Sequence, residues 1–285
     1  MTLLHAILLG IVQGLTEFIP ISSTAHLVLA SRLMSLTLTP AQLTASIAVI
    51  QLGTLIAVLF YFAGDIWSIS VAFVRDHLAL ISGGRKSGAR LSHEAQLGWL
   101  VIIGSIPVAV VGLLFKKQIE GTFTKNLWVI ATMMVVIAVL LGIAELVGRK
   151  QRTMEELGWK DALAMGFAQC LALIPGSSRS GSTIMGGLFV GEARETAARF
   201  SFLLSIPAIA ASGLLELKEA LHKLPQGSLT TLAVGTLVSG IVGYASIWFL
   251  LRFLKTHTTG VFIGYRLIVG GAILIMLFSG RISGL

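Results

Sequence analysis

The chain has 285 residues, of which 55% are hydrophobic and only 12% are charged. Soluble domains carry about 25% charged residues, so this composition excludes a water-soluble globular protein and a disordered one. The net charge of +8 comes from basic residues scattered between apolar stretches. Such scatter is typical of membrane proteins and forms no patch for nucleic acid. The apolar runs are poor in strand-forming sequence, so we expect an all-α, polytopic membrane protein.

A helix needs about 20 apolar residues to cross a bilayer. Six stretches meet this requirement and are expected to be transmembrane helices: Leu43–Ala63, Leu97–Phe115, Leu127–Val147, Phe200–Leu217, Leu229–Leu251 and Val261–Ser279. Two further apolar regions, residues 3–38 and 161–190, are interrupted by proline and hydroxyl residues, so that each half is too short to span. We expect these regions to be re-entrant helical hairpins, which are tolerated at membrane depth where protein buries them or where they line a wet cavity.

The two interrupted regions have similar sequences. Each contains G-x-x-Q-x-L, from Gly10 and from Gly166, followed by P-x-S-S, from Pro20 and from Pro175. Three expected spans follow each copy, and because three is odd the second copy enters the membrane from the opposite face. This predicts an inverted-topology repeat in one domain of residues 1–285, with repeat 1 over about 1–147 and repeat 2 over about 161–285. Broken helices at matching positions of such repeats mark a binding site.

The distribution of Lys and Arg orients the chain. They are more numerous on the face that carries segments 64–96, 148–160 and 252–260. By the positive-inside rule this face is cytoplasmic, with 64–96 as a long loop and both termini outside.

The second interruption has the composition of an anion site. Its run Pro175-Gly-Ser-Ser-Arg-Ser-Gly-Ser-Thr183 places Arg179 at membrane depth, where a charge costs roughly 2.5–3.5 kcal/mol and marks a function by default. Glycines let the backbone approach a ligand, N–H groups at a helix start and hydroxyls donate to it, and a guanidinium matches phosphate oxygens. A close crossing of two helices would explain Gly181 but not Arg179.

The first interruption offers complementary groups. Gln13 and Glu17 are four residues apart and share a helix face, where a carboxylate and an amide could hold a hard cation. A helix that begins near Ser22 would bring the Ser23 hydroxyl beside the His26 imidazole, which together with Glu17 forms a set for nucleophilic catalysis.

Simpler interpretations stay open beside these. Ser22 could be a helix N-cap, His26 an interfacial histidine, and Glu17 with Arg179 an ion pair that only holds the hairpins together. Glu145 and Arg266 lie near span ends, where we expect them to snorkel or to pair. The segment Gly191–Arg199 is expected to be a solvated, structural turn.

The motifs Gln13-Gly-Leu-Thr-Glu17-Phe-Ile-Pro20-Ile-Ser-Ser-Thr-Ala-His26 and Pro175-Gly-Ser-Ser-Arg179-Ser-Gly-Ser-Thr183 resemble the two signatures of the undecaprenyl-pyrophosphate phosphatase family, also called the bacitracin-resistance protein family. The resemblance covers essentially the whole chain in length, span number and motif order. It implies hydrolysis of the C55 polyprenyl pyrophosphate to the monophosphate, which recycles the lipid carrier for peptidoglycan and other envelope polymers. It also implies bacitracin resistance, because bacitracin sequesters the same pyrophosphate.

The resemblance further implies a divalent cation, Mg²⁺ or Ca²⁺, a location in the bacterial cytoplasmic (inner) membrane, and a site that faces the periplasm. Gln13 and Glu17 fall on the family's paired E/Q-x-x-x-E positions, and Arg179 on its phosphate-binding arginine. The family's serine, threonine and histidine positions fall on Ser22, Ser23, Thr24 and His26. Two positions depart from the common form: Gln13 replaces a glutamate, which leaves one carboxylate for a metal, and Ala25 replaces a glycine.

These patterns give one set of expected roles. The expected catalytic residues are Glu17, Ser23, His26 and Arg179, and the expected cation ligands are Glu17 and Gln13. The expected pyrophosphate-binding residues are Ser22, Thr24, Ser178, Ser180, Gly181 and Thr183. Ser23 is the candidate nucleophile with His26 as base and then acid, and a water activated by His26 or Glu17 is the alternative.

A flippase or transporter for an isoprenoid phosphate is the alternative function, because inverted repeats with broken helices are also typical of transporters. The hydroxyl, imidazole and carboxylate favour an enzyme, since a carrier needs no base. The expected partners are the membrane and the lipid substrate undecaprenyl pyrophosphate, and a homo-oligomer is compatible with the sequence.

Overall fold

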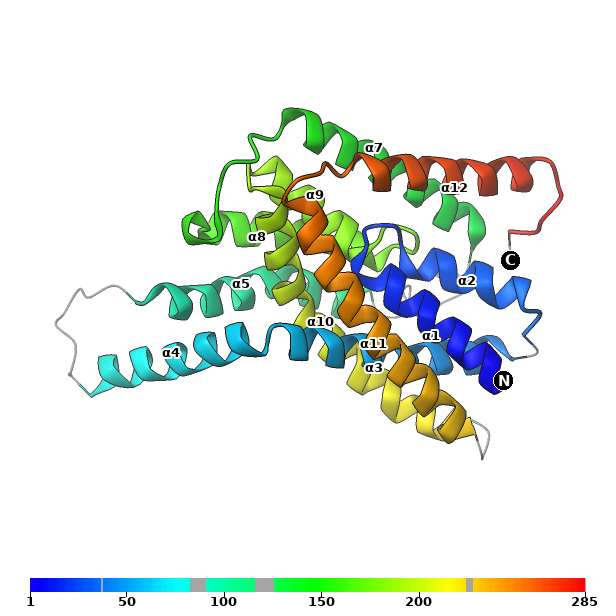
Figure 1. The fold of residues 1–285 in the computed structure, drawn as a ribbon, viewed down its shortest axis with the longest axis horizontal. Helices are drawn as coiled ribbons and strands as arrows, with labels where there is room; N and C mark the ends of the chain where they lie inside the picture. The colour runs from blue at the N-terminus through cyan, green and yellow to red at the C-terminus, as the bar shows by residue number, and fades with distance from the viewer. Residues whose placement is uncertain (37, 83–90, 116–125, 224–227, 285) are drawn as a thin grey trace.

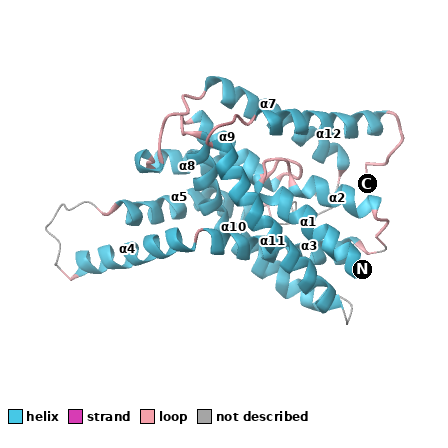
Figure 2. Cartoon of the chain, in the orientation of Figure 1, coloured by secondary structure: helices cyan, strands magenta, loops and turns pink. Residues whose placement is uncertain are grey.

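The computed structural model describes residues 1–36, 38–82, 91–115, 126–223 and 228–284, and this part of the chain is helical (Figures 1 and 2). The first half contains α1 (Leu3–Phe18), α2 (Ser23–Leu33), α3 (Pro40–Tyr61), α4 (Ala63–Ile81), α5 (His93–Leu114) and α7 (Leu127–Val147). The second half contains α8 (Trp159–Cys170), α9 (Arg179–Phe189), α10 (Arg194–Lys223), α11 (Ser228–Leu254) and α12 (Gly260–Phe278), with short 3₁₀ turns at Met154–Glu156 and Leu171–Leu173.

Five described helices are long and apolar enough to cross a membrane, namely α3, α5, α7, α11 and α12. They coincide with five of the six expected spans, and their ends differ from the expected ends by about one helical turn or less. The sixth expected span, Phe200–Leu217, falls within α10, although the side chains of residues 212 and 214–217 lie outside the described ones. The chain is therefore a multi-pass membrane protein.

The expectation of a loop over residues 64–96 was wrong for its first half, which forms α4. This helix packs along α5, with Phe73 against Gly98, and Asp76 accepts a hydrogen bond of 2.7 Å from the backbone N–H of Ser92. Its opposite face carries an exposed apolar stripe at helical spacing: Trp67, Val71, Val74, Leu78 and Ile81. Charged residues between these apolar positions lower the mean hydropathy of the segment, so the sequence did not indicate an apolar helix face.

Both interrupted regions are pairs of short helices separated by a break, as their prolines predicted. The residues that precede the second helix of each pair, Ser22 and Ser178, have left-handed φ angles of 79° and 69°. Each serine oxygen accepts a hydrogen bond from the backbone N–H three residues later, at Ala25 and Gly181. A positive φ is uncommon for a non-glycine residue, so the two breaks share an unusual local geometry, and Ser22 is the N-cap that its position suggested.

The first helix of each pair packs closely on a span from the other half of the chain. In Figure 1, α11 lies alongside α1, and α8 lies near α5. A Cβ on Gly10 would lie 2.4 Å from the carbonyl oxygen of Gly235, and a Cβ on Gly166 would lie 2.3 Å from that of Gly104. The glycine of the G-x-x-Q-x-L motif therefore has the same packing role in both pairs.

The apolar core anchors the end of α1. Phe18, the last residue of this helix, is buried and packs edge-to-face on Phe202 of α10, with ring centroids 5.3 Å apart. Phe62 packs on the same Phe202 ring at 6.2 Å. These contacts fix the point at which the first break begins.

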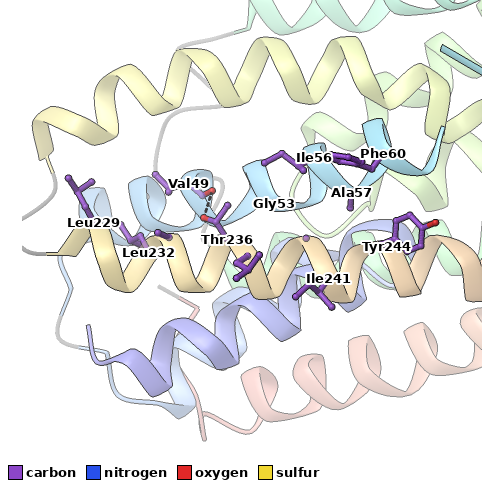
Figure 3. A pocket seen from close by; sticks show the side chains of 13 residues that line it. Val49, Gly53, Ile56, Ala57, Phe60, Leu229, Leu232, Thr236, Ile241 and Tyr244 are labelled. Atoms are coloured by element: carbon purple, nitrogen blue, oxygen red, sulfur yellow. Dashed lines mark hydrogen bonds between the residues drawn. The ribbon is translucent and has the colours of Figure 1, made fainter. Parts of the chain in front are cut away.

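An apolar groove of about 810 Å³ lies between α3 and α11 (Figure 3). It forms where the two helices cross closely, since a Cβ on Gly53 would lie 2.0 Å from the carbonyl oxygen of Thr236. The Thr236 hydroxyl donates to the Val49 carbonyl across the crossing at 3.0 Å, and Phe60 and Tyr244 lie toward one end. The lining residues of this groove are uncharged.

Candidate functional site

The two breaks meet inside the helix bundle through an ion pair. Arg179, the first residue of α9, donates to Oε1 of Glu17 near the end of α1. The amide nitrogen of Gln13 donates to Oε2 of the same carboxylate at 2.8 Å, and both residues of α1 are buried. The predicted shared face of Gln13 and Glu17 is therefore confirmed, and Arg179 is brought to it from 162 positions away.

A second arginine, Arg266 of α12, holds the breaks together. Its side chain is fully buried and donates to five backbone carbonyls, at distances of 3.0–3.3 Å. The carbonyls belong to the first break, the second break and α7: Pro20, Gly176, Ser177, Met133 and Met134. Our expectation that Arg266 snorkels or pairs near a span end was wrong, because it points into the protein and has no carboxylate partner among the described residues. The one sequence signal for its role was an arginine inside an apolar stretch.

The start of α9 concentrates hydrogen-bond donors beside Arg179. The Ser178 and Ser180 hydroxyls lie 3.2 Å apart, and the Gly181 N–H is directed at Ser178. A helix N-terminus carries partial positive charge, which adds to that of the two arginines. Thr183 is turned away from this group, because its hydroxyl contacts Ser201 of α10 and donates to the Arg179 carbonyl at 2.8 Å.

Three further buried polar side chains flank the second break. Ser177 lies in the break, Ser182 in the first turn of α9, and Gln169 in the last turn of α8, at the motif position that Gln13 occupies in the first pair. None of their side chains forms a hydrogen bond with another described residue. Buried polar groups without a hydrogen-bond partner are rare in native structures. From the sequence, none of these three residues was expected to be a site residue.

The hydroxyl and imidazole groups of the first break are not arranged as we expected from the sequence. His26 is half-buried, with Nδ1 2.7 Å from the Ser22 carbonyl oxygen and Nε2 2.6 Å from the Tyr265 hydroxyl of α12. Ser23 and Thr24 lie at the start of α2, and neither hydroxyl forms a hydrogen bond with another residue in the described part of the chain. The structure thus connects His26 to Tyr265, which sequence reasoning missed, and not directly to Ser23.

Glu17 is the one carboxylate at the junction of the breaks. No group of three or more His, Cys, Asp or Glu side chains that could hold a metal occurs among the described residues. Mg²⁺ is often bound through one or two carboxylates together with phosphate oxygens of a substrate. Glu17 and the amide oxygen of Gln13 therefore fit a cation that a bound pyrophosphate helps to coordinate.

A separate polar network lies at the other end of α7. Glu145 pairs with Arg194 and accepts a hydrogen bond of 2.7 Å from the Thr259 hydroxyl, so the expected pairing of Glu145 is confirmed. In the neighbouring segment Gly191–Arg199, the expectation of a solvated turn was wrong, because residues from Arg194 onward form the first turns of α10 and no residue of the segment is exposed. The clearest departure is the side chain of Glu192. This carboxyl group is fully buried, no described residue donates to it, and burial raises its pKa to about 8.

Comparison with known proteins gives a consistent result. The family model described as bacitracin resistance protein BacA matches residues 6–272. The undecaprenyl-diphosphatase of Syntrophobacter fumaroxidans is 52% identical over 280 residues, which cover 98% of both chains. Those of Chlorobium limicola and Mycolicibacterium gilvum are 49% and 47% identical, over 99% and 100% of both chains.

Proposed function

The chain belongs to the bacitracin resistance protein BacA family, and we infer from this membership and from the site that it is an undecaprenyl-diphosphatase. It removes the terminal phosphate of undecaprenyl pyrophosphate and releases undecaprenyl phosphate. The reaction returns the lipid carrier to peptidoglycan synthesis and underlies bacitracin resistance. The observation that carries this conclusion is the convergence of Arg179, Arg266 and the start of α9 on the junction of two broken helices.

We propose that six transmembrane helices and two re-entrant pairs, α1–α2 and α8–α9, form an inverted-topology repeat. The matched packing of Gly10 on Gly235 and of Gly166 on Gly104 supports this repeat. The serines with left-handed φ angles at both breaks support it as well. In this arrangement the breaks lie at membrane depth in the bacterial inner membrane, and the site opens toward the periplasm. The excess of basic residues on the opposite face supports that orientation.

The pyrophosphate is proposed to bind between the start of α9 and the first break. Arg179 supplies a planar guanidinium for phosphate oxygens, and Ser178, Ser180 and the Gly181 N–H lie beside it. On the other side Ser22 and Thr24 complete the proposed set. Thr183 supports the first turn of α9 through its hydrogen bond to the Arg179 carbonyl. Because Glu17 pairs with Arg179, a pyrophosphate that binds Arg179 competes with this carboxylate for the guanidinium.

We propose a divalent cation, Mg²⁺ or Ca²⁺, as the cofactor, held by Glu17 and the amide oxygen of Gln13 with the substrate. When bound, it neutralises the charge of the pyrophosphate oxygens. The protein's own part is positional: Gln13 and Arg179 orient the Glu17 carboxylate through its two oxygens. Phosphoryl transfer depends mainly on such positioning and charge neutralisation.

Two nucleophiles fit this site, the Ser23 hydroxyl and a water molecule. Either attacks the terminal phosphorus, His26 accepts the proton, and the bond to the bridging oxygen of undecaprenyl phosphate breaks. His26 then gives this proton to the departing undecaprenyl phosphate. With Ser23 a phosphoserine forms, and water hydrolyses it while His26, neutral again, acts as base.

Substrate labelled in its terminal phosphate distinguishes the two nucleophiles. We expect acid quenching during turnover to trap labelled protein, and Ser23→Ala to abolish both the label and turnover. Ser70→Ala, which removes an exposed hydroxyl on α4 outside the proposed site, is the matched control for labelling at Ser23. A Ser23→Ala protein with near-wild-type turnover would exclude the serine and leave water as the nucleophile.

A further inference from the structure

The hydrogen bonds of His26 define its tautomer. Nδ1 lies 2.7 Å from the backbone carbonyl of Ser22, and a carbonyl oxygen only accepts, so Nδ1 carries the hydrogen of the neutral ring. Nε2 then has the free lone pair and accepts from the Tyr265 hydroxyl at 2.6 Å. The two rings are almost parallel, at 17°, with centroids 5.6 Å apart.

Both partners of His26 are fixed by the surrounding structure. The Ser22 carbonyl belongs to the left-handed N-cap of α2. Tyr265 precedes Arg266, whose five hydrogen bonds fix this turn of α12 against both breaks and α7. A histidine whose ring nitrogens both have rigid partners is held in one orientation and one tautomer.

We propose that Tyr265 is a further catalytic residue of the phosphatase reaction, which passes the proton of the nucleophile to Nε2 of His26. This rests on the proposed function, in which His26 accepts the proton of the nucleophile. Neutral Nε2 has one lone pair, and the Tyr265 hydroxyl donates to it, so the nucleophile reaches this nitrogen through the phenol. As the phenol oxygen takes the proton of the nucleophile, the phenol gives its own hydrogen to Nε2 and then accepts a hydrogen bond from the Nε2–H. The second hydrogen bond is charge-assisted and is the stronger one.

The ionisable groups on the elements packed against α2 at this point are few. They are Tyr265 and Arg266 of α12, and Glu17 of α1, which is paired with Arg179. The one acidic residue of α7, Glu145, lies at the far end of that helix in the network with Arg194. Tyr265 is thus the neutral group that contacts Nε2 directly.

The test is Tyr265→Phe, which keeps the ring and removes the hydroxyl, with Tyr244→Phe in the apolar groove as the matched control. A side chain that transfers a proton in the transition state typically contributes about 10²–10⁴-fold. We expect kcat of Tyr265→Phe to fall about 10²–10⁴-fold with little change in KM. We expect the acidic limb of its pH–rate profile to move to lower pH, because the imidazolium loses its acceptor. Tyr244→Phe should match the wild type.

The outcomes separate a catalytic role of Tyr265 from a structural one. An unchanged kcat, or a lower kcat with an unchanged pH profile, would overturn the proposal. Unfolding midpoints in detergent verify that both variants are folded. If His26→Gln retains full turnover, His26 is not the base, and both this proposal and that part of the proposed mechanism fail.

A second measurement tests the hydrogen bonds independently of activity. In protein labelled with ¹⁵N-histidine, the signals of His26 are identified by their loss in His26→Gln. We expect a protonated Nδ1 and an unprotonated Nε2 in the wild type, and a change centred on Nε2 in Tyr265→Phe. A protonated Nε2 in the neutral ring would overturn the proposal even if the phosphatase activity is established.

Discussion

Replacement of Arg266 by methionine tests the most extensive hydrogen-bond group of the site. The substitution keeps an apolar, flexible chain of similar length and removes all five donated hydrogen bonds. The carbonyls of Met133 and Met134 lie inside α7, where helix hydrogen bonds remain available to them. Those of Pro20, Gly176 and Ser177 lie in the breaks, so these three lose their interaction with Arg266 without a helical replacement.

The expected loss of stability follows from those three carbonyls. Hydrogen bonds inside membrane proteins contribute about 0.6 kcal/mol on average and about 1.7 kcal/mol at most. A buried acceptor left without a donor costs about 1–3 kcal/mol in proteins generally. We therefore expect Arg266→Met to lower the free energy of unfolding by about 2–5 kcal/mol. Arg266→Lys should recover only part of this, because an ammonium lacks the planar fork that reaches both breaks.

The assay is unfolding by SDS from mixed micelles, followed by far-UV circular dichroism. The matched control is Arg281→Met, which removes an exposed arginine just beyond the same helix. We expect the control to unfold like the wild type. If Arg266→Met also lies within about 0.5 kcal/mol of the wild type, the five hydrogen bonds do not hold the breaks together and the reasoning is refuted.

Three further predictions concern separate parts of the molecule. The pKa of Glu192 is about 8 in the folded protein, against an ordinary value of 4.5. Between these pH values the folded state keeps a proton that the unfolded state releases. The free energy of unfolding therefore falls as pH rises through this window, by up to roughly 4–5 kcal/mol. Glu192→Gln should abolish that slope in thermal unfolding between pH 5 and 9, and an unchanged slope would contradict the assignment. Gly166→Ala should lower the unfolding midpoint, because its Cβ would lie 2.3 Å from the Gly104 carbonyl oxygen. Gly64→Ala is the control and should leave the midpoint unchanged, because a Cβ there would meet no atom within 4 Å. Equal midpoints for the two variants would refute the close crossing. Glu17→Gln should raise the Mg²⁺ concentration for half-maximal activity at least tenfold, a typical effect of losing a metal carboxylate or its orienting partner, and an unchanged Mg²⁺ titration would remove Glu17 from the cation site.

The helices and breaks of this protein could be predicted because their signals are local. An apolar run of the right length, in which Glu145 is the one charged residue, predicted both ends of the helix Leu127–Val147 correctly. Pro20 and Pro175 located the two breaks because clustered hydroxyl residues follow each of them. Pro107 and Pro207, which no such cluster follows, lie inside α5 and α10. The four-residue spacing of Gln13 and Glu17 predicted their shared face.

The features that sequence reasoning missed depend on contacts between distant segments. Arg266 looked like a residue near a span end, and only the packing of α12 against both breaks shows its five carbonyl partners. Tyr265 carries no signal of its own and is identified by His26, 239 positions away. Glu192 sits in a polar segment that becomes buried when its backbone forms a bridge with Arg152. The apolar face of α4 was hidden because charged residues interrupt it in the linear sequence.

The most direct test of the central claim is phosphate release from C55 polyprenyl pyrophosphate by the detergent-purified protein, with and without EDTA. Arg179→Ala is measured beside Arg281→Ala, which removes an exposed arginine outside the proposed site. We predict release that EDTA abolishes, that Arg179→Ala loses and that Arg281→Ala retains. Folded wild-type protein that releases no phosphate with any divalent cation would contradict the assignment, and lipid transport would become the function to test.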